Sequence, residues 1–263
     1  MLRQADLALF RLGLDRIRDC LPPAFCDSDE PPWAVHCATY GALDRCFLER
    51  EASRRVNVDA TLRLLDELDQ LGLRQVYLST SYVFDGERGD YSETDRCSPI
   101  SEYGRQKREV ELWILEHLPQ ALILRLDKTV GSDPQQRHLF SEWWELVRCG
   151  QPILCIADQL FAPTLVNDVA HGIRAACQRR LTGLYHLANS ERFYRDQLAS
   201  EFLLAVGESV PVQIRPQAEF GFADRRPQRT TLNTSRFRQA THLEFTPIRE
   251  VLRVFAERLR RGD

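Results

Sequence analysis

Two residues with complementary chemistry lie four positions apart near the middle of the chain. Tyr103 and Lys107 have the spacing that places two side chains on one face of a helix. A phenol beside an ammonium group has its ionised form favoured, so we expect the pKa of Tyr103 to fall toward the working range. Such a tyrosine can protonate an oxyanion as hydride reaches a carbonyl carbon, or accept the proton in reverse.

The scarcity of lysine makes this pair more specific than the motif usually is. The 263 residues include seven tyrosines and only two lysines, Lys107 and Lys128, so random placement gives about 0.05 Tyr-x-x-x-Lys pairs. The alternative is a surface tyrosine beside a solvated lysine. A retained ammonium group can also donate hydrogen bonds to a cofactor ribose.

A hydroxyl-rich segment follows the apolar run at residues 75–80. It reads Ser79-Thr80-Ser81-Tyr82-Val83-Phe84-Asp85-Gly86, and the run before it is typical of a strand. Ligands of open parallel sheets bind beyond the carboxyl ends of the strands. A hydroxyl at this exit can therefore hold a substrate carbonyl against Tyr103, although Ser/Thr-rich strand exits are also common without function.

The elements that must position these residues alternate along the chain. Apolar periodicity predicts strands at 33–38, 75–80, 121–126, 153–156, 183–188 and 211–215, and helices at 49–71, 103–117, 138–149, from 166, at 194–206 and at 248–260. This alternation predicts an α/β, Rossmann-like, doubly wound parallel sheet. We expect a partial dinucleotide-binding domain over 1–150 and a smaller α/β substrate lobe over 151–263, interleaved with the main sheet.

Composition excludes several classes of function. A formal net charge of -3 gives no global signal for nucleic acid or an anionic membrane, and no apolar run approaches the ~20 residues of a membrane helix. Residues 1–21 are typical of an amphipathic helix and not of a signal peptide. The eight cysteines form no zinc-ligand spacing, so we expect reduced, structural thiols, no metal and a cytoplasmic protein.

At this point the chain resembles the dTDP-4-dehydrorhamnose reductase family of extended short-chain dehydrogenases/reductases. The resemblance spans roughly residues 33 to 255. It rests on the segment from Ser79 to Gly86 and on the following sequence elements: Tyr91-Ser92-Glu93-Thr94-Asp95, Pro99, Tyr103-Gly104-Arg105-Gln106-Lys107, Val56-Asn57-Val58, Leu124-Arg125, Val130-Gly131, Phe161-Ala162-Pro163-Thr164, Asp168-Val169-Ala170, Arg226-Pro227 and Leu232-Asn233.

The resemblance implies roles for particular residues and ligands. The catalytic residues would be Thr80, Tyr103 and Lys107. Cofactor contacts would come from Ala38, Asn57, Ser79, Tyr103 and Lys107, and substrate contacts from Ser81, Tyr82, Val83, Phe84 and Arg226. The cofactor would be NADPH or NADH, and the substrate a nucleotide-linked 4-keto-6-deoxysugar of dTDP-rhamnose biosynthesis. The resemblance leaves open whether the protein forms a homodimer.

Three departures from the family pattern stand out. The family begins with a Gly-x-x-Gly-x-x-Gly turn that lets a pyrophosphate approach a helix N-terminus, whereas Gly13 and Gly41 are isolated here. We expect either an incomplete N-terminus or a lost cofactor cradle. Ser81 stands where the family usually has Asp. His36 stands in the usual Asn-Ala-Ala segment, as a cofactor neighbour or as a structural residue.

Two other functions remain open. One is a non-catalytic regulatory or binding protein on the same fold, for which the regulatory subunit of methionine adenosyltransferase sets a precedent. The other is an extended-family epimerase or dehydratase. Ser81-Tyr82 places no carboxylate beside Thr80, which argues against elimination and says less about epimerisation.

Overall fold

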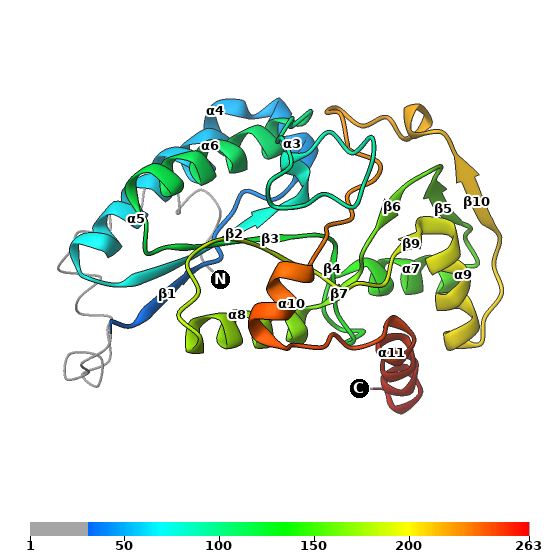
Figure 1. Cartoon of the computed structure of the whole chain (residues 1–263). Helices are drawn as coiled ribbons and strands as arrows, with labels where there is room; N and C mark the ends of the chain where they lie inside the picture. Colours follow the sequence, from blue (N-terminus) through cyan, green and yellow to red (C-terminus); the bar gives the residue numbers. More distant parts are fainter. Residues whose placement is uncertain (1–30, 263) are drawn as a thin grey trace.

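Four parallel strands form the centre of the computed structural model, which describes residues 31–262. They are β1 (Trp33–His36), β2 (Arg74–Thr80), β3 (Leu122–Leu126) and β8 (Gly183–Leu187), and they lie side by side in the order β1-β2-β3-β8 (Figure 1). All three pairings are parallel. The carboxyl ends of the strands therefore meet at one edge, where a ligand site is expected.

Helices cover both faces of this sheet. One face carries α4 (Arg50–Arg54), a π-helical segment (Arg55–Ala60), α5 (Thr61–Gln70) and α6 (Glu102–His117), and the other carries α8 (Val166–Gln178) and α10 (Ser235–Thr241) (Figure 1). Apolar side chains of α5 and α6 pack on Tyr77 and Ile123, and those of α8 and α10 pack on Leu122 and Leu124. The predicted α/β class with a doubly wound parallel sheet is confirmed.

A second group of elements lies beside the sheet. Strands β5 (Ile153–Ile156) and β10 (Val212–Arg215) pair in parallel, and α7 (Leu139–Arg148), α9 (Arg195–Val206) and α11 (Ile248–Arg261) pack around them. Its core is aromatic: the Phe140 and Phe202 rings contact each other, and each also contacts Trp143 and Phe255. Two short ladders, β4 (Thr129–Val130) with β7 (Thr164–Leu165) and β6 (Leu160–Phe161) with β9 (Phe193–Tyr194), connect the two parts.

The chain crosses between these two groups more than once. Helix α7 precedes residue 150 but packs in the aromatic core, whereas α8, β8 and α10 follow residue 150 and pack with the main sheet. Sequence analysis did not predict α3 (Leu43–Leu48), α10 or the π-helical segment. The predicted helix at residues 1–21 lies outside the described residues. No helix between residues 31 and 262 has the length and apolar character needed to cross a membrane.

Candidate active site

The amino end of α6 is held tightly against the exit of β2. Ser101 caps α6, since its hydroxyl accepts a hydrogen bond from the backbone N–H of Gly104 at 3.1 Å. A Cβ at Gly104 would lie 2.1 Å from the carbonyl oxygen of Tyr82, so only glycine allows this approach. Thr80 ends β2, and its hydroxyl accepts from the Tyr82 N–H at 3.2 Å. Sequence and packing together bring Tyr103 to Thr80.

Lys107 lies beneath Tyr103, one turn further along α6. It is 4% exposed, and its ammonium group donates to the Leu78 carbonyl oxygen at 3.0 Å. The ammonium nitrogen lies 4.7 Å from the centroid of the Tyr77 ring and 5.9 Å from that of Tyr103. Burial lowers the pKa of Lys107 to about 8, partly offset by the negative charge of Glu111.

The expected fall in the pKa of Tyr103 is wrong for this structure. Burial raises the pKa of Tyr103 above its ordinary value, and side-chain hydrogen bonds with Thr39 and Thr80 offset only part of that effect. The ammonium group of Lys107 bonds to a backbone carbonyl and lies over the face of the Tyr103 ring. Helical i, i+4 spacing predicts that both side chains lie on one face. It could not show that desolvation of Tyr103 outweighs the effect of the Lys107 charge on its pKa.

Asn57 braces the segment that follows β1 against α6. Its side-chain oxygen accepts from the Tyr40 N–H at 2.7 Å, and its amide nitrogen donates to the Gln106 side chain at 2.8 Å. Asn57 lies in the π-helical segment, a distortion that is frequent at functional sites. Ala38, expected to contact cofactor, is exposed just beyond β1. Asn57 therefore has its side chain engaged by protein groups, whereas Ala38 is open to a ligand.

A cavity of about 500 Å³ opens beside Thr80 and Tyr103. Ser81, Tyr82 and Arg226, three of the expected substrate contacts, also line it. The remaining lining residues were not predicted as site residues: Gly41, Leu43, Asp127, Lys128, Thr129, Ile156, Gln159, Phe161, Arg195, Phe220, Phe222 and Thr230. The structure thus brings a hydroxyl, a phenol and several cations to one cavity.

Three cations line this cavity: Lys128, Arg195 and Arg226. Arg195 donates to the Gln159 side chain at 3.2 Å and lies 5.6 Å from the Trp143 ring centroid. Desolvation by burial lowers the pKa of Arg195. Arg226 pairs with Asp44 at 2.8 Å. The Nε atoms of both arginines are buried and have no hydrogen-bond partner within the described part of the chain. Such a cluster suits a polyanionic ligand.

Asp127 supplies a carboxylate next to Ser81. Its side chain accepts from Ser81 at 3.1 Å, from Thr230 at 2.7 Å and from the Ala162 N–H at 2.6 Å. Burial raises the pKa of Asp127 to about 6, although these hydrogen bonds oppose the rise. Asp127, at the exit of β3 and 46 residues later in the chain, therefore places a carboxyl group within hydrogen-bond distance of Ser81.

Three expected ligand contacts point elsewhere. Ser79 donates to Glu111 at 2.5 Å, and Glu111 forms a buried ion pair with Arg125 at 2.7 Å. Val83 and Phe84 are fully buried in a separate apolar cluster and do not line the cavity. The 3-10 turn after Thr80 is followed by burial of both side chains in the core, and substrate contact by Val83 and Phe84 stays a prediction.

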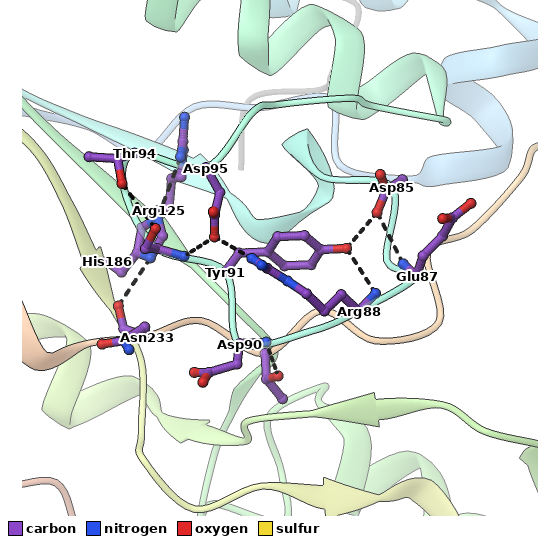
Figure 2. Close-up of polar contacts among 12 residues, drawn as sticks. Asp85, Glu87, Arg88, Asp90, Tyr91, Thr94, Asp95, Arg125, His186 and Asn233 are labelled. Atoms are coloured by element: carbon purple, nitrogen blue, oxygen red, sulfur yellow. Dashed lines mark hydrogen bonds and ion pairs between the residues drawn. The ribbon is translucent and has the colours of Figure 1, made fainter.

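The loop after β2 is closed by its own polar contacts (Figure 2). The Tyr91 hydroxyl donates to Asp85 and accepts from the Arg88 N–H, and Arg88 forms an ion pair with Asp95 (Figure 2). The Tyr91 ring also stacks on Phe84, with the ring centroids 4.2 Å apart. These contacts hold the strand exit that carries Thr80.

The described residues fit one half of a dinucleotide. Ala38 is exposed beyond β1, and the next residue, Thr39, hydrogen-bonds to Tyr103. The ammonium group of Lys107 makes one hydrogen bond among the described residues. This arrangement suits a nicotinamide ribose. Within residues 31–262 there is no glycine-rich turn at a helix N-terminus that would receive the pyrophosphate.

The fold and site define a Rossmann-like α/β protein with a Tyr/Lys pair at the strand ends. The chain belongs to the RmlD substrate binding domain family, whose sequence model matches residues 16–261. The recognition of the dTDP-4-dehydrorhamnose reductase family from sequence is thereby confirmed.

Named relatives and a solved structure extend the comparison. The chain is 31% identical to methionine adenosyltransferase 2 subunit beta of Danio rerio, covering 86% of this chain and 72% of that protein. It is 28% identical to dTDP-4-dehydrorhamnose reductase of Sinorhizobium fredii, over 87% of this chain and 77% of that protein. Its fold matches the NADP complex of the Bacillus anthracis dTDP-4-dehydrorhamnose reductase with a TM-score of 0.82 and 24% identity. The match covers 95% of this chain and 85% of that chain.

Proposed function

We propose that this protein is an NAD(P)H-dependent reductase of a nucleotide-linked 4-keto-6-deoxysugar. The observation that carries the proposal is the single cavity that has Thr80 and Tyr103 on its wall together with Lys128, Arg195 and Arg226. The hydroxyl groups suit a carbonyl, and the three cations suit a diphosphate. Named reductases among the relatives support the same reading.

The proton chemistry is assigned to three side chains. Thr80 donates a hydrogen bond to the substrate carbonyl oxygen and holds it beside the Tyr103 hydroxyl. As the carbonyl is reduced to an alcohol, the Tyr103 proton passes to that oxygen, and Lys107 stabilises the phenolate that remains. A nicotinamide cofactor, when bound, supplies the hydride. Lys107 and Ala38 would contact its ribose and nicotinamide half.

Burial of Tyr103 gives the proposal a chemical direction. A phenol with a raised pKa stays protonated at neutral pH, so it is available as the acid for reduction. The reverse oxidation would need the phenolate, which burial disfavours. The raised pKa therefore fits Tyr103 as the proton donor in reduction.

The test uses the purified 263-residue chain with NADPH and NADH. Binding is followed by nicotinamide fluorescence, and turnover by the fall in reduced-cofactor absorbance on addition of a dTDP-4-keto-6-deoxyhexose. We expect turnover by the native chain and a loss of about 10²-fold or more in Tyr103→Phe. Tyr194→Phe, at the exposed end of β9 just before α9, is the matched control.

A second candidate is a non-catalytic binding subunit on the same fold. The 31% identity to a methionine adenosyltransferase subunit favours it. In the same experiment, an absence of cofactor oxidation with every 4-keto sugar nucleotide tried would rule out the reductase. Saturable binding without turnover would then support the second candidate.

A further inference from the structure

The carboxylate of Asp224 holds the backbone at the start of α6. Its Oδ2 accepts a hydrogen bond from the Glu102 N–H at 2.7 Å, across 122 positions of the chain. Its Oδ1 accepts from the N–H of Arg225 at 2.8 Å. Asp224 is 7% exposed, so these contacts are largely withdrawn from water. A residue far along the chain therefore holds the position that directly precedes Tyr103.

This contact satisfies a backbone group that the helix itself leaves open. The first N–H groups of an α-helix have no partner within the helix. At α6 the Ser101 hydroxyl accepts from the Gly104 N–H, and Asp224 accepts from that of Glu102. A negative charge is also favourable at the amino end of a helix. Two acceptors therefore fix the turn that contains Tyr103, one from the adjoining loop and one from the C-terminal part of the chain.

The segment that carries Asp224 also reaches the cavity. Arg226, two residues further on, lines the cavity and forms an ion pair with Asp44 at 2.8 Å. Its guanidinium group lies 3.6 Å from the centroid of the Phe222 ring. The Asp224 N–H also donates to the Asp44 carboxylate, at 3.5 Å. Residues 224–226 therefore form a short link between the helix that carries Tyr103 and a cation of the cavity wall.

We propose that Asp224 is a positioning residue: its carboxylate fixes the first turn of α6 and thereby places the Tyr103 hydroxyl against a substrate held beside Arg226. This inference rests on the proposed function of Tyr103. Loss of the acceptor frees the backbone N–H of Glu102, and Tyr103 is the next residue. A displacement of about 1 Å at a reacting group can lower the rate by about 100-fold, so a small movement of this turn is enough.

The chain provides a matched control at another helix. Glu191 accepts from the N–H of Ile248, the first residue of α11, at 2.6 Å and across 57 positions. Neither residue lines the cavity. Glu191→Ala therefore removes the same kind of contact from a helix that carries no site residue. Asp224→Ala and Glu191→Ala should each lower the melting temperature by about 2–4 °C.

The first arm of the test does not require turnover. The chain is labelled with 3-fluorotyrosine, and the fluorine NMR resonance of Tyr103 is assigned by its loss in Tyr103→Phe. We expect this resonance to shift or broaden in Asp224→Ala and to stay unchanged in Glu191→Ala. Asp224→Asn keeps an acceptor oxygen and should keep the native resonance. A Tyr103 resonance that is the same in Asp224→Ala as in the native chain would overturn the proposal.

The second arm separates kcat from KM for the nucleotide-linked sugar. In Asp224→Ala we expect kcat to fall by about 10- to 100-fold while KM changes by less than about threefold, because the acid is displaced and the binding groups remain. Asp224→Asn should recover most of kcat, and Glu191→Ala should retain it. Equal losses in the two alanine variants would show only lost stability and would refute the role of Asp224. A native chain without turnover would refute the reductase proposal, whereas the fluorine resonance would still decide whether Asp224 places Tyr103.

Discussion

At the scale of single residues, the site combines an acid that burial keeps protonated with cations that lack matching carboxylates. Tyr103 is raised in pKa by desolvation, and Lys107 is lowered to about 8 by the same cause. Arg195 and Lys128 line the cavity, and neither forms an ion pair with a carboxylate within residues 31–262. The negative charge of a bound nucleotide-linked sugar would pair with these cations.

We predict that Arg195→Gln weakens binding of the nucleotide sugar more than it slows chemistry. A hydrogen bond to a charged group is worth about 1.5–3 kcal/mol, so KM should rise by about 10- to 100-fold while kcat changes little. Initial rates at varied substrate, and calorimetric binding of dTDP, measure the effect. Arg192→Gln, which removes an exposed ion pair with Asp90, should leave both constants unchanged. Equal affinities of Arg195→Gln and the native chain for dTDP would contradict the role of Arg195.

Sequence reasoning found the residues whose spacing is local. Tyr103 and Lys107 are four apart, so helical periodicity placed their side chains together, whereas Thr80 was selected among the hydroxyls at the strand exit by the family resemblance. Arg195 and Asp127 enter the cavity from the ends of distant elements, and only the tertiary fold shows this. Lys128 carried one available signal, since it is the other lysine in a lysine-poor chain.

At the scale of elements, the close approach of α6 to the exit of β2 determines where Tyr103 lies. The long periodic helices and the apolar strands were predictable because burial imposes a clear period on them. The six-residue α3 and the π-helical segment were not, because α3 is short and the π turn depends on long-range contacts of Asn57.

We predict that Gly104→Ala destabilises the protein and removes activity together. The new Cβ would lie 2.1 Å from the Tyr82 carbonyl oxygen, so α6 must move away from the strand exit. Overpacking of this kind costs about 1–3 kcal/mol, and even a shift of about 1 Å at Tyr103 impairs catalysis. Thermal unfolding and turnover are the measurements. Gly41→Ala, whose Cβ would meet its nearest atom at 3.5 Å, should melt like the native chain.

At the scale of the whole molecule, buried ionisable groups couple stability to pH. Burial lowers the pKa of His36 to about 4 and that of His186 to about 3, against about 6.5 when unfolded. The unfolded chain then binds more protons, so this stability is present above pH 6.5 and is lost as pH falls. Burial raises the pKa of Asp127 to about 6, so protonation of Asp127 adds stability as the pH falls over the same range.

We predict a net loss of stability between pH 7 and pH 5. Each histidine should lose about 2 kcal/mol over this range, and Asp127 should return about 1 kcal/mol. Urea unfolding at the two pH values measures the free energy of unfolding. Asp127→Asn lacks the compensating carboxyl, so its stability should fall by about 1 kcal/mol more than that of the native chain. A native chain equally stable at both values would contradict the assignment of neutral, buried histidines.

The contacts of the Arg-Pro segment have a consequence for protein synthesis. A Cβ at Gly86 would lie 2.3 Å from Pro227, the Asp90 N–H bonds to Thr231 across 141 positions, and Arg226 and Thr230 line the cavity. Thr80, Tyr103 and Lys107 leave the ribosome long before this segment does. A growing chain can therefore form the sheet and the catalytic pair while one wall of the cavity is still unmade, so substrate binding should appear only as translation nears its end.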